Sequence, residues 1–300
     1  MSHELPHRVL LAVDGSVHAN QAAQYLADYG AMFGVWTIVV LHVQCADGSS
    51  ILFPDGGATS ADMTELGADV TGEARRILDA AKLPYAVDTQ LGDPADIIAR
   101  EAYAEHMDEI IMGSRGMSPW TGLVLGSVAY KVIHRVAIPI TVVGVPQREA
   151  NHTAKELNGI HRVLLAVDGS KHASQAVDYV CRLRHGRNLL EVELLSVAPP
   201  MPPGYTRGFV KQELIDNYHR EQGESALQTA CHLLHAADVK FNVHVVPGHP
   251  AETIVDVAKK HDCTRVVMGT RGLGTINSLV LGSVAYKVLH LSPVPVTLVK

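Results

Sequence analysis

Residues 111–116 read IMGSRG, and the triplet GSV follows at residues 126–128. The pattern returns as VMGTRG at residues 267–272, again with GSV ten residues after the second glycine, at residues 282–284. An apolar run that opens into glycines and is followed by a helical pattern predicts a strand, a tight loop and a helix start. Because both copies keep the spacing, the chain is predicted to contain two copies of one domain.

The glycine pattern has a chemical interpretation and a purely structural one. Glycine leaves no Cβ between the main chain and a ligand and adopts positive φ, so successive N–H groups can converge on an anion. A helix start adds unpaired N–H groups and the positive end of the helix dipole, and Ser127 and Ser283 add hydroxyl groups there. The pattern therefore predicts a phosphate-binding loop. The alternative is that the glycines only allow a helix to pack closely on a sheet.

A second repeat places an acid at the end of a strand. The ten residues HRVLLAVDGS at 7–16 return letter for letter at 161–170. A continuous apolar run is typical of a strand covered on both faces, and it ends here at Asp14 or Asp168. Ligands bind at the carboxyl ends of such strands, which favours a ligand role for the acid. The alternative role is helix capping, for which Ser16 is the rival candidate.

Each half alternates five strands with four helices, which predicts an α/β fold with a mostly parallel, doubly wound, Rossmann-like sheet and right-handed crossovers. The predicted domains are residues 1–145 and 161–300, with 146–160 as a linker. In such a sheet Asp14, Val43 and Gly113 all fall at carboxyl strand ends and face one crevice. The remaining predicted strands are 36–43, 85–91, 109–112 and 138–143 in the first half and 189–197, 241–246, 265–268 and 294–299 in the second; helices are expected near 62–82 and 209–237 and from Pro94 and Pro250.

The last predicted strand of each half has a proline as its second residue, Pro139 or Pro295. Because proline cannot donate to a sheet ladder, each of these strands is predicted to lie at an edge. An open apolar edge invites pairing, so the two halves are expected to pair through their last strands in a pseudo-twofold arrangement. Pairing between two chains, which gives a homodimer, is the alternative. The halves diverge most after the second strand, where a lid over the crevice or a partner-specific surface is expected.

Composition excludes several classes of function. A formal net charge of −6 argues against nucleic-acid binding, and no apolar run reaches the roughly 18 to 20 residues that a membrane helix needs. The first residues lack a secretion signal, so a cytoplasmic location is expected. The four cysteines form no C-x-x-C pair and are predicted to be reduced, mostly buried thiols. His232 and His235 share a helix face without a third ligand at readable spacing, so no metal site is predicted.

Together the two motifs and the final proline-containing strand resemble a tandem universal stress protein, and the resemblance covers nearly the whole chain. It implies a five-stranded Rossmann-like fold and ATP as the ligand. It also implies that Asp14 and Asp168 hold the adenosine and that Val43 and Val197 offer backbone contacts to adenine. The residues expected around the ribose and phosphates are Met112, Gly113, Arg115, Gly116, Gly126, Ser127 and Val128, and in the second half Met268, Gly269, Arg271, Gly272, Gly282, Ser283 and Val284.

Standard equipment for phosphoryl transfer is missing from the sequence. There is no G-x-x-x-x-G-K-[ST] loop, and no acid is placed by motif to act as a base. Magnesium would accompany ATP through the phosphates. The favoured function is therefore a regulatory ATP-binding stress-response protein. A slow ATPase or nucleotidyl-transferring enzyme and a structural module that binds no nucleotide are the alternatives.

Overall fold

The computed structural model describes residues 7–30, 36–45, 60–116, 125–144, 161–183, 190–198, 227–273 and 281–300. The chain divides into two compact units, Met1–Gln147 and Arg148–Lys300. The predicted linker at 146–160 and the predicted lid segments after the second strand of each half lie outside the described residues.

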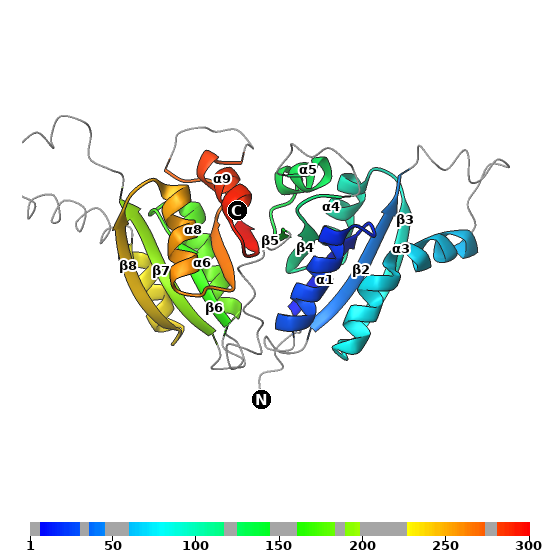
Figure 1. The fold of residues 1–300 in the computed structure, drawn as a ribbon, viewed down its shortest axis with the longest axis horizontal. Coiled ribbons are helices and arrows are strands. Elements are labelled where there is room, and N and C mark those ends of the chain that lie inside the picture. The colour runs from blue at the N-terminus through cyan, green and yellow to red at the C-terminus, as the bar shows by residue number, and fades with distance from the viewer. Residues whose placement is uncertain are drawn as a thin grey trace, which may run out of the picture. The chain divides into compact units, whose positions relative to one another are not determined.

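The first unit is a parallel five-stranded sheet in the order β3-β2-β1-β4-β5 (Figure 1). Helices α1 and α3 pack together on one face, and α4 and α5 pack together on the other. Its elements are β1 His7–Val13, α1 Val17–Gly30, β2 Trp36–Gln44, α3 Ser60–Ala80, β3 Tyr85–Leu91, α4 Pro94–Ala104, β4 Glu109–Gly113, α5 Ser127–Arg135 and β5 Ile140–Val143.

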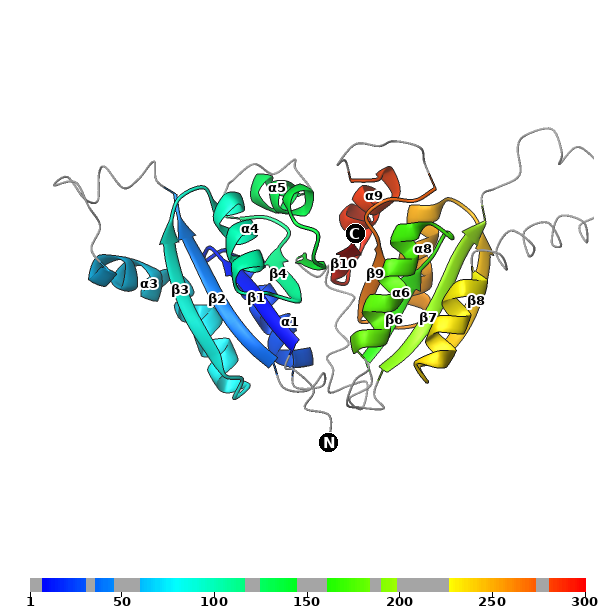
Figure 2. The same cartoon turned by 180° about the vertical axis from the view of Figure 1, so that it is seen from behind.

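The second unit repeats this plan in the order β8-β7-β6-β9-β10, again with parallel strands (Figure 2). Helix α6 covers β9 and β10 on one face, and α8 packs with α9 over β6 and β7 on the other. Its elements are β6 His161–Ala166, α6 Lys171–Leu183, β7 Leu190–Ala198, a helix at 227–236, β8 Lys240–Pro247, α8 Pro250–Lys260, β9 Arg265–Gly269, α9 Ser283–Leu291 and β10 Val296–Val299. The predicted fold class is confirmed for both units.

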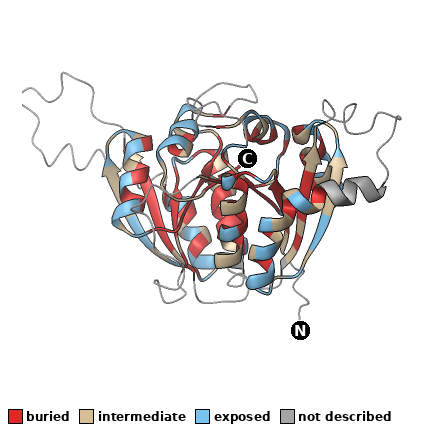
Figure 3. Ribbon diagram, turned by 45° about the vertical axis from the view of Figure 1, so that its right-hand side comes forward, coloured by how far each residue is buried: buried red, intermediate tan, exposed pale blue. Residues whose placement is uncertain are grey.

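The central strands are buried because helices cover both of their faces. In β1 the side chains of Val9, Leu10 and Leu11 have no exposed surface, and Figure 3 shows the central strands of both units mainly in red, the colour of buried residues, whereas the outer strands β3 and β8 contain no buried residue. A strand covered on both faces needs a continuous apolar run, which the repeated HRVLLAV provides. The residue that follows this run, Asp14, therefore lies at the carboxyl edge of the sheet.

The predicted starts of the last strands need correction. The last strands begin at Ile140 and Val296, after their prolines and not before them. Proline has no N–H to give to a ladder, although the carbonyl oxygen of Pro139 still accepts from the Ile110 N–H at 3.0 Å.

The cysteines are free thiols, as expected, but the prediction that most are buried was wrong. Only Cys263 is buried; Cys181 and Cys231 are half-buried and Cys45 is exposed. Cys181 lies on α6 and Cys231 on the helix at 227–236, and one side of a surface helix meets solvent. Cys45 follows the end of β2.

Candidate functional site

The carboxyl ends of two neighbouring strands bring the conspicuous motifs together in each unit. Strand β1 pairs in parallel with β4, with Ala12 beside Met112, and in the second unit Ala166 lies beside Met268. The chain leaves β1 for β2 on one side while β4 lies on the other, so the strand order reverses here. In open α/β sheets this switch point is where ligands bind.

Asp14 follows β1 and turns toward the start of the next helix. Gly15 has φ +77°, which lets the chain reverse direction, and the Ser16 N–H then donates to Asp14 Oδ1 at 3.0 Å. The Ser16 hydroxyl oxygen accepts from the Ala19 N–H at 3.2 Å and so caps α1. Asp168 and Ser170 repeat both contacts at 3.0 and 3.2 Å. The serine, and not the acid, is therefore the helix cap.

The second glycine of each loop lies against this acid. A Cβ built on Gly116 would come within 2.4 Å of Asp14 Oδ2, and one on Gly272 would come within 2.4 Å of Asp168 Oδ2. The Ser16 hydroxyl also donates to the Arg115 carbonyl oxygen at 3.4 Å, which ties the loop to the start of α1. Any side chain at this position would have to displace the carboxylate.

Helices α5 and α9 each begin at a glycine, so the N-cap residue itself has no side chain to accept from the first N–H groups. Gly126 and Gly282 are the N-caps, without a side-chain hydrogen bond and without an acid in the first turn. Their own N–H groups donate back to the loop, Gly126 to the Ser114 carbonyl oxygen at 2.8 Å and Gly282 to that of Thr270 at 2.9 Å. A helix start of this kind favours an anion.

The first glycine of each loop, Gly113 or Gly269, is explained by packing and not by a ligand. A Cβ on Gly113 would lie 2.8 Å from the carbonyl carbon of His18 and 2.9 Å from the Ala19 nitrogen, both backbone atoms of α1. A Cβ on Gly269 would lie 2.7 Å from the Cβ of His172. At these two positions glycine allows a helix to pack closely on a strand, which is the structural alternative considered above.

Histidines that sequence reasoning did not assign to the site lie beside it. Burial lowers the pKa of His18, the Arg115 guanidinium lowers it further, and Asp14 opposes them. His18 Nε2 is buried and has no hydrogen-bond partner among the described residues. His172 is placed alike: burial and then Arg271 lower its pKa. The recurrence of the histidine in both halves was the available signal.

The second site carries an additional cation. Burial lowers the pKa of Lys300, and the nearby Arg271 guanidinium lowers it further. Lys300 follows β10, whereas Gly144 follows β5 in the first unit. Thr270 in this loop is 3% exposed, and its hydroxyl group has no hydrogen-bond partner among the described residues. The two sites therefore share a backbone plan and differ in charge.

The other predicted site residues lie along the same edges. Val43 and Val197 are half-buried, one residue before the ends of β2 and β7. Met112 and Met268 are 5% and 6% exposed and belong to the core of their units. The first turns of α5 and α9 contain the exposed Ser127 and Ser283 and the half-buried Val128 and Val284.

The fold and these edges define a tandem Rossmann-like α/β protein with one candidate ligand site in each unit. The model of the universal stress protein family matches residues 6–144 and again 159–300. The chain belongs to the universal stress protein family, a family of stress-response proteins.

A relative and a solved structure that match nearly the whole chain agree with the tandem organisation. A universal stress protein of Mycobacterium bovis is 26% identical over 309 residues, which cover 97% of this chain and 96% of the relative. The crystal structure of a universal stress protein from Archaeoglobus fulgidus matches 99% of both chains, with a TM-score of 0.68 and 26% identity. A family protein of Arabidopsis thaliana, solved with AMP bound, covers 49% of this chain and 97% of its own, at 18% identity and a TM-score of 0.35. Among the described residues, no helix has the length and apolar character to cross a membrane.

Proposed function

We propose that the chain is a regulatory protein that binds ATP at the carboxyl edge of each sheet and serves the stress response without consuming the nucleotide. The observation that carries the proposal is the duplicated contact between an acid and a glycine loop, Asp14 with Gly116 and Asp168 with Gly272. It stands beside a helix start whose N-cap residue is a glycine, which has no side chain to cap the first N–H groups. An acid for hydroxyl groups and the N–H groups of a helix start for phosphates suit a nucleotide.

Each group would have a separate task in holding ATP. Asp14 keeps one carboxylate oxygen on the Ser16 N–H, and the carboxylate would accept from a ribose hydroxyl. The strand end at Val43 would offer backbone groups to adenine, as Val197 would in the second unit. The N–H groups at the start of α5 would take the phosphates, with the Arg115 guanidinium as a counter-charge. Magnesium would enter with the phosphates.

Binding without turnover follows from what the loop lacks. The sequence has no lysine in a phosphate-loop motif. His18 has a lowered pKa, but a lowered pKa in a buried histidine is also what burial beside an arginine produces in a structural role. ATP occupancy would act by favouring one of two conformations or partners. A slow ATPase remains the catalytic alternative, and turnover measured against a pocket variant tests it.

A scaffold that binds no nucleotide is the second candidate, and a specific observation favours it. Gly113 and Gly269 owe their identity to packing against α1 and α6, so these two glycines say nothing about a ligand. The scaffold leaves the contact of Gly116 with Asp14 and the uncapped start of α5 without a purpose.

A cytoplasmic location belongs to the same proposal, because ATP is abundant there. Pairing of the two halves through their last strands, or of two chains in a homodimer, also stays a prediction.

Isothermal titration of the full chain with ATP separates the candidates. In Gly116→Ala the new methyl group would displace the Asp14 carboxylate, so ATP affinity at the first site should fall about tenfold or more, which corresponds to about 1.4 kcal/mol. Gly72→Ala is the matched control, because a Cβ there meets nothing within 4 Å. Equal affinity in Gly116→Ala and in the wild type would refute the site. If the wild type binds no ATP, the scaffold that binds no nucleotide is the remaining candidate.

A further inference from the structure

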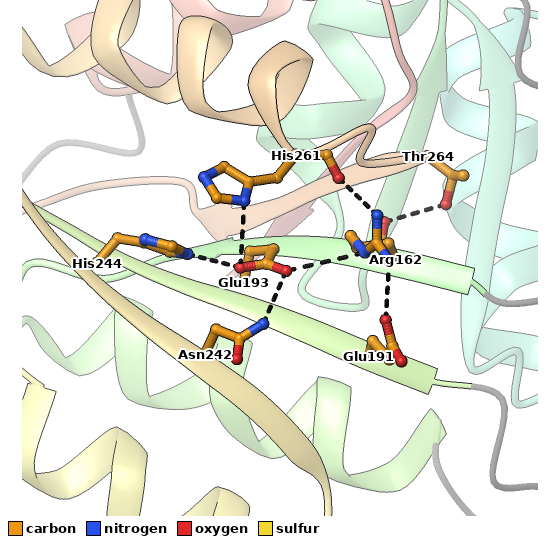
Figure 4. Close-up of polar contacts among 7 residues, drawn as sticks. All are labelled: Arg162, Glu191, Glu193, Asn242, His244, His261 and Thr264. Carbon is orange, nitrogen blue, oxygen red and sulfur yellow. Dashed lines mark hydrogen bonds and ion pairs between the residues drawn. The ribbon is translucent and has the colours of Figure 1, made fainter. Parts of the chain in front are cut away.

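Three metal-binding side chains meet in the second unit, away from the glycine loop. Glu193 lies in β7, His244 in β8, and His261 at the C-terminal end of α8 (Figure 4). Glu193 Oε2 is 2.6 Å from His244 Nε2 and 3.7 Å from His261 Nδ1. One ligand atom from each residue lies within 4.8 Å of the other two.

We propose that Glu193, His244 and His261 form a binding site for a divalent transition-metal ion of the zinc class. Two imidazoles and one carboxylate suit Zn²⁺ and its neighbours, whereas Ca²⁺ and Mg²⁺ prefer oxygen ligands throughout. Three protein ligands leave a fourth position for water or another small ligand.

The distances permit a metal without rebuilding the fold. Bonds of about 2.0–2.1 Å in a tetrahedral site put neighbouring ligand atoms about 3.3 Å apart. The pair Glu193–His244 at 2.6 Å must open by less than 1 Å, and the pair Glu193–His261 at 3.7 Å must close slightly. Both histidine side chains are partly exposed, at 22% and 27%, so a small movement of each ring meets little resistance and an ion has access.

The carboxylate is held with one oxygen turned toward the histidines. Glu193 is 3% exposed, and its Oε1 accepts from Asn242 Nδ2 at 3.1 Å and lies 3.8 Å from Arg162 Nε. Oε2 is then the oxygen that faces His244 and His261 (Figure 4). Metal-binding carboxylates are commonly oriented by hydrogen bonds of this kind.

The surrounding charges favour a cation. The Arg162 guanidinium is a positive group close to Glu193, and its Nη2 is paired with Glu191 Oε2 at 3.0 Å. The two carboxylates of Glu191 and Glu193 therefore outnumber this one guanidinium. Arg162 Nη1 also donates to the His261 carbonyl oxygen at 3.0 Å, which fixes the end of α8. This end of the helix carries the negative pole of the dipole. Lys259 and Lys260 in the last turn oppose the effect, but both are exposed and screened by solvent.

Among the described residues of the first unit, the equivalent positions do not form such a cluster. The strand register that pairs Glu193 with Asn242 pairs Val39 with Ala86. The residue two positions after Ala86 is Asp88, and the C-cap of α4 is Glu105 where α8 has His261. The metal site would therefore distinguish the second domain from the first, independently of whether either domain binds ATP.

The test uses the full chain, freed of metal by a chelator and kept free of nucleotide, with Co²⁺ as the spectroscopic probe. One Co²⁺ per chain should give the intense visible absorption of a four- or five-coordinate site, and Zn²⁺ should displace it. In His244→Gln and His261→Gln the affinity should fall at least about tenfold. His232→Gln is the matched control, because His232 is an exposed helical histidine outside the cluster and its loss should leave the absorption unchanged.

A purely structural ion pair predicts different results. Co²⁺ would then keep its weak aqueous spectrum, or both cluster variants would bind it as the wild type does, and either result overturns the proposal. Zn²⁺ should also raise the melting temperature of the wild type but not that of His244→Gln. An equal rise in both proteins would overturn the proposal.

Discussion

Replacing Gly113 by alanine should destabilise the first unit, because its neighbours are backbone atoms that cannot rotate away. The new Cβ would lie 2.8 Å from the His18 carbonyl carbon and 2.9 Å from the Ala19 nitrogen. Comfortable contacts between such atoms are about 3.5–4.0 Å, so α1 must move outward by roughly half an ångström or more. Overpacking of this kind costs about 1–3 kcal/mol. Gly269→Ala should behave alike in the second unit, where His172 is the neighbour.

Thermal unfolding of the full chain, followed by circular dichroism, measures the effect. A domain of this size loses roughly 2–4 °C of melting temperature for each kcal/mol, so the transition of the first unit should fall by about 2–12 °C. Gly72→Ala is the control with the opposite sign: Gly72 is in α3 with no atom within 4 Å of an added Cβ, and alanine favours helix by about 0.5–1 kcal/mol. If Gly113→Ala unfolds at the wild-type temperature while Gly72→Ala is stabilised, the packing account of the first glycine is refuted.

Two further predictions concern charge and capping. Arg115→Gln should raise the pKa of His18, because burial and then this guanidinium hold that pKa below 6.5. The unfolded chain therefore takes up the proton at a higher pH than the folded chain does, and the stability of the wild type should fall as the pH drops below about 6.5. In the variant this fall should be less steep. An NMR titration of the His18 ring that shows no shift would contradict this. Asp93→Ala should lower the free energy of unfolding by about 0.5–2 kcal/mol, because the Asp93 side chain caps α4 by accepting from two N–H groups. His249 occupies the matching position at the start of α8 but makes no side-chain cap, so His249→Asp should raise the free energy of unfolding. Melting shifts of the same sign in these two variants would contradict the capping account.

The sequence predicted what depends on local pattern and on repetition. Continuous apolar runs identified the central strands, and β3 was placed at its observed bounds, Tyr85–Leu91. The start of β5 was misplaced by two residues, because the sequence does not show where a ladder resumes after Pro139. The fold class followed from the alternation of elements, since helices that cover both faces require buried strands.

Contacts between distant segments could not be predicted in the same way. His18 and Gly113 are far apart in the chain and meet only because α1 packs on β4, so the sequence offered packing as one role of the glycines but could not assign it to Gly113. The Glu193 cluster draws on β7, β8 and α8, and no spacing within one element reveals it. The available signal was a glutamate between two apolar residues, Val192 and Leu194, in a strand expected to be buried, a placement that requires partners.

Native mass spectrometry of the full chain with ATP tests the central claim most directly. If each domain holds one nucleotide beside its acid, the wild type should bind two ATP molecules, Asp14→Ala one, and the variant that combines Asp14→Ala with Asp168→Ala none. Two ATP molecules retained by the combined variant, or none bound by the wild type, would contradict it.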